Sequence, residues 1–424
     1  MTDQRPVSVP TASRFSRISL PSALAAVILG GTVVNAREPA SPRTPLDDYI
    51  AKPDSSYSWK VVKTASRPGM RTFVLEMVSQ TWRTAAEVDR PVWRHWMTVA
   101  CPDKLTAATG FLLIGGGSNR GDPPAGPSEM VMKIAQATGT VVTELEMVPN
   151  QPLIFHGDGQ RRGEDDLIGY TWDQFLKTGD PTWPARNPMA KSAVRAMDTV
   201  TELLASEAGG ERTVDRFVVA GGSKRGWTTW ITAAVDQRVV AIVPIVIDVL
   251  NVRESMRHHY EAYGFWAPSI GDYVQHRITE RIDDPRMAEL CRLVDPFAYR
   301  QRLTMPKFIL CAAGDQFFLP DSSRFYFDDL IGPKCLRYVP NGDHSLDGTD
   351  AIESVIAFYS TILRGKQLPK FAWTLEGDDT IRVRATDRPL QVKLWQATNP
   401  EARDFRLESL GPKYTSCVLA DQGG

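Results

Sequence analysis

The sequence predicts an α/β fold with a mostly parallel, doubly wound sheet. The first observation is a series of short, largely apolar segments, which is the composition of strands buried on both faces of a sheet. They lie at residues 110–114, 140–147, 217–220, 239–246, 307–313 and 336–339. The second is that segments with helix-like apolar spacing follow several of them, at residues 130–137, 191–205, 227–235 and 351–363. Strands that alternate with helices predict parallel pairing with helices on both faces.

Short strands flank this alternation on both sides. Residues 72–78 and 92–99 have the β-rich composition of antiparallel strands. Beyond Pro369, the short segments 380–384 and 390–395 predict a small β-rich region over 369–424. It holds few strands, so we expect it to be an incomplete version of a larger β region. The expected α/β domain therefore spans residues 37–368.

The first 36 residues have the pattern of a secretory signal peptide. Arg14 and Arg17 precede an apolar run from Leu20 to Val34, and the run ends at small residues before Arg37. A proline and two glycines interrupt the run, and no cysteine follows it, which argues against a permanent membrane or lipid anchor. We expect an exported protein, periplasmic or extracellular, whose mature chain starts near Arg37.

Composition limits the partners. The chain has 424 residues, of which 42% are hydrophobic and 23% charged, and a net charge of −1. Such a balance gives no general attraction to nucleic acid or to an anionic membrane surface. Five cysteines at 101, 291, 311, 335 and 417 leave at least one without an intrachain partner, and none has the spacing of a metal site. We expect neither a metal nor a cofactor.

One turn has the pattern of a nucleophile elbow. The strand at 217–220 runs into Gly221, Gly222 and Ser223, and a helix-like segment follows. A serine in a tight turn between a strand and a helix is the context that this motif requires. The usual spacing is Gly-x-Ser-x-Gly, whereas here the last glycine is Gly226 and Arg225 takes its place. An ordinary glycine-rich turn with an incidental serine is the alternative.

Two further residues complete a catalytic triad in the expected order. Asp315 follows the strand at 307–313, and His344 follows the strand at 336–339. Ser223, Asp315 and His344 occur in the chain order of α/β-hydrolases, and parallel strands place them at one edge of the sheet. Histidine takes the serine proton, and the carboxylate orients the imidazole. Asp248 is the alternative acid, whereas Asp343 is too close to His344 in sequence.

A glycine loop and the elbow supply candidate donors for an oxyanion. The strand at 110–114 ends in Gly115-Gly116-Gly117-Ser118. We expect the Lys224 N–H, together with an N–H of Gly116, Gly117 or Ser118, to form the oxyanion hole. A plain connecting loop is the alternative.

Two polar clusters have weaker interpretations. Glu164-Asp165-Asp166, in an irregular stretch over 153–190, could bind a cation, but a solvated loop or a helix start is favoured. Residues 250–300 interrupt the alternation with many aromatic side chains and suit a cap over the site. The adjacent His258 and His259 are poorly placed for one metal, because neighbouring helical residues point about 100° apart.

The chain resembles the PhoPQ-activated pathogenicity-related proteins, an α/β-hydrolase-like family. The matching motifs are Leu46-Asp47-Asp48-Tyr49, Pro149-Asn150-Gln151-Pro152, Glu164-Asp165-Asp166-Leu167, Gly222-Ser223-Lys224-Arg225-Gly226-Trp227, Pro244-Ile245-Val246-Ile247-Asp248-Val249-Leu250-Asn251, Gly314-Asp315-Gln316-Phe317-Phe318, Pro340-Asn341, Ala397-Thr398-Asn399-Pro400 and Arg403-Asp404-Phe405-Arg406. The resemblance covers about residues 44–410, and the family's C-terminal β region is shortened here. The elbow is also similar to that of glucuronoyl esterases.

These observations together predict a serine hydrolase. Its expected substrate is a small-molecule or polymer-linked ester, or an amide, bound in part by Arg225 and Trp227. Because Lys224 and Arg225 flank the nucleophile, we expect the substrate to carry negative charge. The alternative for Arg225 is an ion pair with a nearby carboxylate such as Asp248. The alternative function is a secreted binding or signalling protein that keeps the fold without relevant hydrolysis.

Overall fold

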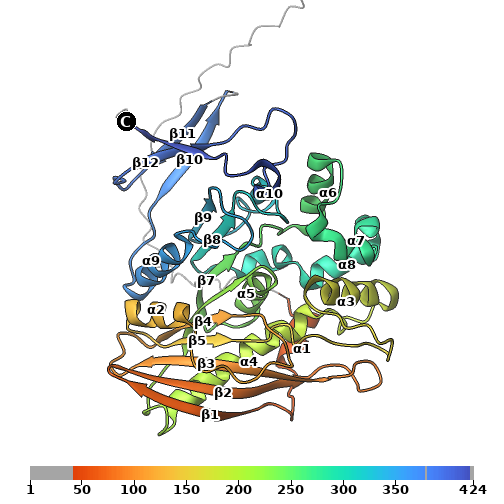
Figure 1. Ribbon diagram of the computed structural model, residues 1–424, viewed down its shortest axis with the longest axis vertical. Coiled ribbons are helices and arrows are strands. Elements are labelled where there is room, and N and C mark those ends of the chain that lie inside the picture. The colour runs from red at the N-terminus through yellow and green to blue at the C-terminus, as the bar shows by residue number, and fades with distance from the viewer. Residues whose placement is uncertain (1–41, 378–379, 421–424) are drawn as a thin grey trace, which may run out of the picture. The chain divides into compact units, whose positions relative to one another are not determined.

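The computed structural model describes residues 42–377 and 380–420, which form a fold around one nine-stranded sheet (Figure 1). The strand order is β1-β2-β3-β5-β4-β6-β7-β8-β9. The strands are β1 (Ser58–Arg67), β2 (Met70–Thr81), β3 (Val92–Pro102), β4 (Thr109–Ile114), β5 (Val142–Leu145), β6 (Arg216–Gly222), β7 (Val239–Ile245), β8 (Lys307–Ala312) and β9 (Lys334–Val339). From β1 to β5 in this order the pairing is antiparallel, and from β5 to β9 it is parallel. The predicted fold class is confirmed.

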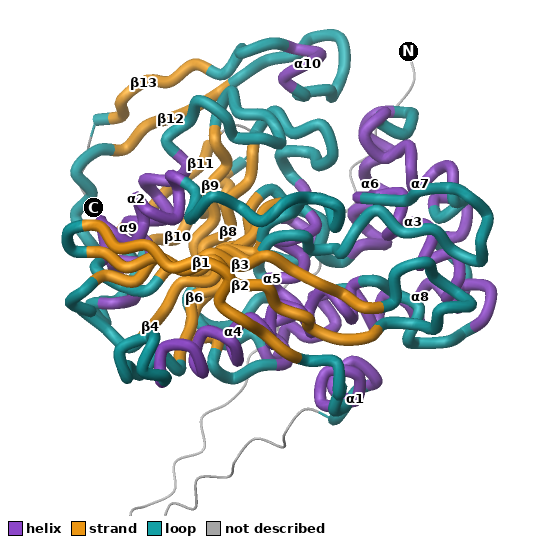
Figure 2. Tube along the Cα trace, turned by 60° about the horizontal axis from the view of Figure 1, so that its bottom comes forward, coloured by secondary structure: helices purple, strands orange, loops and turns teal. Residues whose placement is uncertain are grey.

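Helices cover both faces of the sheet. Ten are present in the described residues: α1 (Pro45–Ala51), α2 (Glu129–Thr138), α3 (Glu164–Thr178), α4 (Arg186–Ala205), α5 (Lys224–Val235), α6 (Val252–Tyr263), α7 (Gly271–Gln275), α8 (Pro285–Val294), α9 (Ala351–Leu363) and α10 (Leu407–Leu410). Neighbouring residues of β6 enter different cores: Val219 packs in the core that contains α4 and α5, whereas Val218 packs in the core that contains α2 and α9. This alternation is the period of two of a strand buried on both faces. Figure 2 shows these helices around the central strands.

Helix α3 corrects the expectation of an irregular stretch over 153–190. Ten of its fifteen residues are buried, including the polar Asp165, Thr171 and Asp173. A helix buried on most of its surface has no simple apolar stripe, so its sequence lacks the usual signal. The acidic cluster at 164–166 forms its first turn, where negative charge stabilises the helix dipole.

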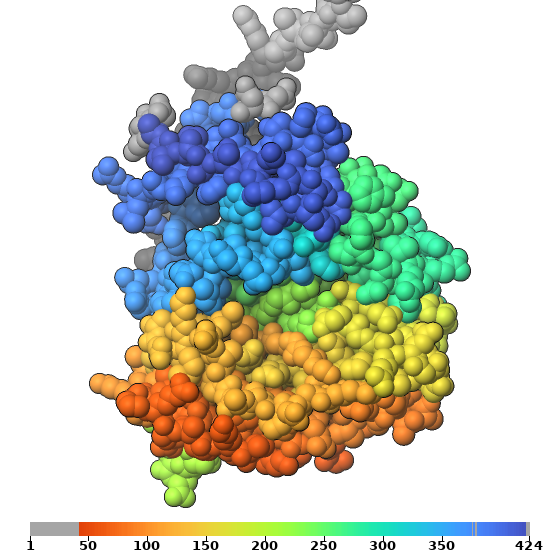
Figure 3. Space-filling view, in the orientation of Figure 1, coloured from red at the N-terminus to blue at the C-terminus, as the bar shows by residue number. Residues whose placement is uncertain are grey.

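The segment between β7 and β8 is helical and lies against α3. It contains α6, α7 and α8 with three short 3-10 turns, at Pro268–Ile270, Thr279–Arg281 and Pro296–Arg302. In Figure 3 the yellow residues around α3 adjoin the green residues of this segment, and His276 Nε2 lies 2.7 Å from Asp166 Oδ1 across that contact. The insertion is therefore packed onto the part of the chain that precedes the elbow.

The C-terminal part contains two antiparallel hairpins, β10 (Phe371–Glu376) with β11 (Thr380–Ala385) and β12 (Val392–Gln396) with β13 (Thr415–Leu419). The expected signal peptide lies outside the described residues. Over the described part of the chain, no helix is both long and apolar enough to cross a membrane. All five cysteines are free thiols.

Candidate active site

Ser223 occupies a strained turn between β6 and α5. Its φ of 55° and ψ of −124° fall where a residue with a side chain is rarely found. Two glycines allow the strand and helix to approach closely. A Cβ on Gly221 would lie 2.6 Å from the Arg225 carbonyl oxygen, and one on Gly226 would lie 2.8 Å from the Gly221 carbonyl oxygen. Gly226 thus faces the strand, which explains why the final glycine of the motif comes one residue late.

Asp315 and His344 are hydrogen-bonded to each other. The loops after β8 and β9 bring His344 Nδ1 within 2.9 and 3.0 Å of the two carboxylate oxygens of Asp315. The Phe317 amide also donates to Asp315, at 2.8 Å, and Asp315 is 3% exposed. With the Nδ1 proton held by the carboxylate, Nε2 is free to act as a proton acceptor.

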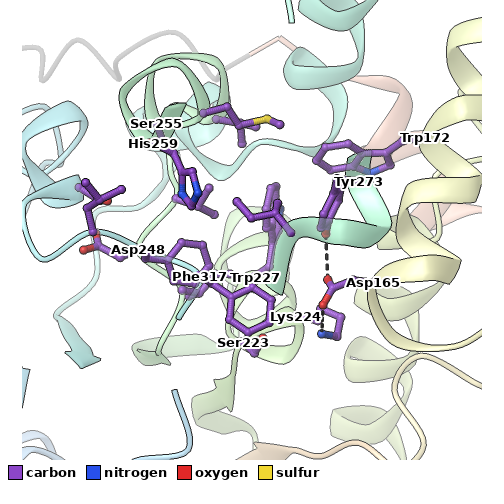
Figure 4. Close-up of a pocket in the computed structure, with 18 of the residues that line it drawn as sticks. Asp165, Trp172, Ser223, Lys224, Trp227, Asp248, Ser255, His259, Tyr273 and Phe317 are labelled. Carbon is purple, nitrogen blue, oxygen red and sulfur yellow. Dashed lines mark hydrogen bonds and ion pairs between the residues drawn. The ribbon is translucent and has the colours of Figure 1, made fainter. Parts of the chain in front are cut away.

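Ser223 lines a cavity that opens to solvent (Figure 4). Its walls come from α3, α4, α5, the helical insertion and the loops after β7 and β8. Phe317 links this cavity to the histidine, because it is part of the wall and its ring centroid lies 4.4 Å from that of His344. Ser223 and Phe317 thus line one cavity and His344 lies against Phe317, whereas within the described residues no hydrogen bond joins Ser223 to His344.

Asp248 has other partners than His344. It follows β7, is 1% exposed, and accepts hydrogen bonds from the hydroxyls of Tyr326 at 2.6 Å and Tyr338 at 2.5 Å. Burial raises the pKa of Asp248 to about 7, and the charge of Asp315 adds to that rise, although the two tyrosine hydrogen bonds oppose it. In this structure Asp248, the alternative acid, is a carboxyl group in the cavity wall that is hydrogen-bonded to two tyrosines.

The raised pKa of Asp248 has a consequence for stability. The folded protein holds this proton up to about pH 7, whereas the unfolded chain releases it near the ordinary value of 3.8. The carboxyl therefore lowers the free energy of unfolding progressively as pH rises between those values. We expect the stability of Asp248→Asn relative to wild type to increase from pH 5 to pH 8, as measured by urea unfolding. A difference that stays constant with pH would contradict this.

Arg225 is engaged by protein groups and does not line the cavity. Its guanidinium nitrogens lie 2.6 and 2.8 Å from the two carboxylate oxygens of Glu164, and its Nε donates to the Val148 carbonyl at 2.5 Å. Burial raises the pKa of Glu164, but the hydrogen bonds and charge of Arg225 outweigh it and hold that pKa at about 2. In the structure Arg225 forms an ion pair with Glu164 and not with Asp248, while its contact with substrate stays a prediction.

The same guanidinium packs closely against the glycine loop after β4. A Cβ on Gly116 would lie 2.6 Å from an Arg225 nitrogen, and Gly117 has a φ of 117°. The carbonyls of Gly115 and Gly116 accept hydrogen bonds from the chain at Val148 and Met147. Within the described residues, the amides of Gly116 and Gly117 have no protein acceptor. These amides, with the Lys224 amide in the first turn of α5, stay the predicted oxyanion donors.

Lys224 and Trp227 both line the cavity. Lys224 Nζ lies 2.7 Å from Asp165 Oδ2 and 3.2 Å from Glu164 Oε2, so its charge is paired. The Trp227 indole donates to the Val294 carbonyl at 2.6 Å, which leaves its ring as part of the wall. The acidic cluster at 164–166 therefore neutralises the cations that flank the nucleophile.

The two adjacent histidines take separate partners. His258 Nε2 lies 2.9 Å from Asp321, whereas the buried His259 accepts from the Ala267 amide at 3.1 Å and stacks on Trp266. Over the described residues, no group of three or more side chains is arranged to hold a metal ion. His259 and Tyr273 of the expected cap line the cavity together with Arg186, which the sequence did not single out. They come from helices that carry no local motif.

Comparisons with known proteins agree with this architecture. The model of the PhoPQ-activated pathogenicity-related protein family matches residues 46–406. Autocrine proliferation repressor protein A from Dictyostelium discoideum is 40% identical over 384 residues, which are 86% of this chain and 76% of that protein. Acetyl xylan esterase from Paenibacillus sp. R4 is 16% identical with a TM-score of 0.52, over 75% of this chain and 90% of that chain, which shows a shared fold. The chain therefore belongs to the PhoPQ-activated pathogenicity-related protein family.

Proposed function

We propose that this chain is an exported serine hydrolase that cleaves an ester, or an amide, through a covalent intermediate on Ser223. The observations that carry the proposal are the Asp315–His344 hydrogen bond and a strained elbow serine that lines a cavity. The named esterase with the same fold supports the reaction class by analogy. Export rests on the expected leader at residues 1–36.

The chemistry follows from the roles of these groups. Ser223 Oγ attacks the carbonyl carbon while His344 Nε2 takes the hydroxyl proton. Asp315 keeps the imidazole oriented and stabilises its positive charge. The amides of Lys224 and of Gly116 or Gly117 donate to the oxyanion of the tetrahedral intermediate. His344 returns the proton to the leaving alcohol or amine, and a water molecule then releases the acyl group by the same steps.

A second function has one observation in its favour. The Dictyostelium relative, at 40% identity, bears the name of a proliferation repressor and not of an enzyme. A secreted signalling or binding protein could keep this fold without hydrolysis being relevant. The two functions differ in whether Ser223 is an activated nucleophile.

Labelling with a fluorophosphonate probe separates the two functions, because it requires a serine whose proton a neighbouring base can take. We expect the native protein to be labelled and Ser223→Ala to remain unlabelled. Ser322→Ala is a matched control, since Ser322 is a buried serine of the same cavity wall. Absence of labelling in folded wild-type protein would favour the signalling function.

A further inference from the structure

We propose that Arg186 forms a carboxylate-binding subsite in the cavity beside Ser223. This inference rests on the proposed hydrolase function and narrows its substrate class. The substrate would be an ester that carries a second, free carboxylate a few bonds away from the reacting carbonyl. The sequence suggested negative charge in the substrate, but it directed that role to Lys224 and Arg225, which the structure shows to be paired.

Arg186 contacts two residues of the first turn of α5, Lys224 and Trp227. It is the first residue of α4, is 2% exposed, and lines the same cavity as Ser223. One guanidinium nitrogen, Nη1, donates to the Lys224 carbonyl at 3.0 Å, and Cζ lies 4.1 Å from the Trp227 ring centroid. The guanidinium is therefore next to the peptide of Lys224, the residue that follows Ser223.

The carboxylates near the elbow pair with other cations and not with Arg186. Glu164 pairs with Lys224 and Arg225, and Asp165 pairs with Lys224. Within the described residues, Arg186 has no carboxylate oxygen within 4.0 Å, and its buried Nε has no hydrogen-bond acceptor. A side-chain hydrogen bond links Arg186 to Tyr273, whose hydroxyl donates its own proton to Asp165 at 3.0 Å, so Asp165 attracts Arg186 without forming a direct ion pair with it.

A buried guanidinium that has neutral hydrogen-bond partners but no carboxylate is costly, and a substrate anion would lower that cost. A buried charge normally has a partner of opposite charge. The low dielectric constant of the interior raises the free-energy cost of an isolated charge, and it also strengthens the attraction between two opposite charges. The planar guanidinium can donate two parallel hydrogen bonds to a carboxylate, which fixes the anion's orientation as well as binding it. The aromatic rings of Trp172, Trp227 and Phe317 line the same cavity.

Two activated esters of the same acyl length test this subsite. In 4-nitrophenyl hemisuccinate the acyl group ends in a carboxylate, whereas in 4-nitrophenyl butyrate it ends in a methyl group. We expect wild-type kcat/KM to be higher for the hemisuccinate. In Arg186→Met the ratio of the two kcat/KM values should fall about 30-fold, the scale of a lost hydrogen bond to a charged group. Arg186→Lys keeps the positive charge but lacks the planar group that donates two parallel hydrogen bonds, so it should give an intermediate ratio.

Arg162→Met is the matched control. Arg162 is a buried arginine stacked on an aromatic ring, with Cζ 4.1 Å from the Tyr170 centroid, but it is paired with Asp158 and does not line the cavity. Its substitution should leave the ratio at the wild-type value. Arg225→Met should lower kcat/KM for both esters in the same proportion, since it removes the support of the glycine loop.

Three results would overturn the subsite. They are a wild-type enzyme that prefers the butyrate, an equal loss on both esters in Arg186→Met, and a ratio that falls equally in Arg162→Met. The second would assign Arg186 to supporting the Lys224 carbonyl. The first needs no variant, so the inference stays testable even if Arg186→Met does not fold.

Failure of the hydrolase proposal can be told apart from failure of the subsite. If wild type resists the fluorophosphonate and cleaves neither ester, the proposed function is wrong, and the subsite is then tested by binding alone. We expect succinate, but not uncharged succinamide, to raise the wild-type unfolding temperature, and Arg186→Met to lose that shift. Equal effects of succinate and succinamide on wild type would overturn the subsite.

Discussion

Replacing Ser223 with alanine is expected to lower kcat for a 4-nitrophenyl ester by about 10⁶-fold, the scale found when a serine hydrolase loses its nucleophile. The change removes only the oxygen that forms the acyl-enzyme. Alanine keeps the Cβ of the elbow residue, so the strained φ of 55° costs the folded state the same free energy. The measurements are kcat by single-turnover assay and the free energy of unfolding by urea titration.

The matched control for this variant is Ser322→Ala, which removes a hydroxyl from the same cavity wall. It should retain kcat within a few-fold of wild type, as expected for a side chain outside the reacting group. A Ser223→Ala protein that folds normally and retains more than about 1% of wild-type kcat would show that another group is the nucleophile.

Replacing Asp315 with asparagine is expected to lower kcat by about 10⁴-fold, as this change does in a serine protease. The asparagine amide would donate to His344 Nδ1 where the carboxylate now accepts, so the imidazole would carry its proton on Nε2. That nitrogen could then no longer take the Ser223 proton. The predicted loss is therefore in kcat, with KM for a small neutral ester changed little.

Asp248→Asn is the comparison that makes this prediction specific. Asp248 also follows a parallel strand, but its oxygens accept from Tyr326 and Tyr338. Its substitution should cost much less in kcat than Asp315→Asn when both folded variants are assayed on one ester. The opposite ranking would move the acid of the triad to Asp248 and leave Ser223 and His344 in their roles.

The order of the strands along the chain explains why the sequence favours Asp315 over Asp248 as the partner of His344. His344 follows β9, and β9 pairs with β8, whose end carries Asp315. Asp248 follows β7, which is one strand further away in the sheet. Parallel strands that are consecutive in the chain are often adjacent in the sheet, so this contact could be anticipated from their order.

Other features of the fold and the site could not be predicted, because no pattern in the nearby sequence indicates them. Helix α3 is buried on most of its surface, so the periodicity that predicts a helix on one face of a sheet is missing. Arg225 stands in the elbow, where a substrate role is a natural interpretation, and its partner Glu164 lies 61 residues earlier. Which carboxylate neutralises which cation depends on how α3 packs on α5, and no local pattern encodes that packing.

The sequence by itself determined the fold class, the elbow, and the strand ends that carry Ser223, Asp315 and His344. These features depend on the periodicity of apolar residues and on glycines where a strand and a helix approach each other closely. Both are properties of short segments. Only the tertiary structure decided that Arg186 lines the cavity without an ion-pair partner among the described residues, while Lys224 and Arg225 are neutralised. The reason is physical: the state of a buried charge depends on every group that surrounds it, and those groups come from distant parts of the chain.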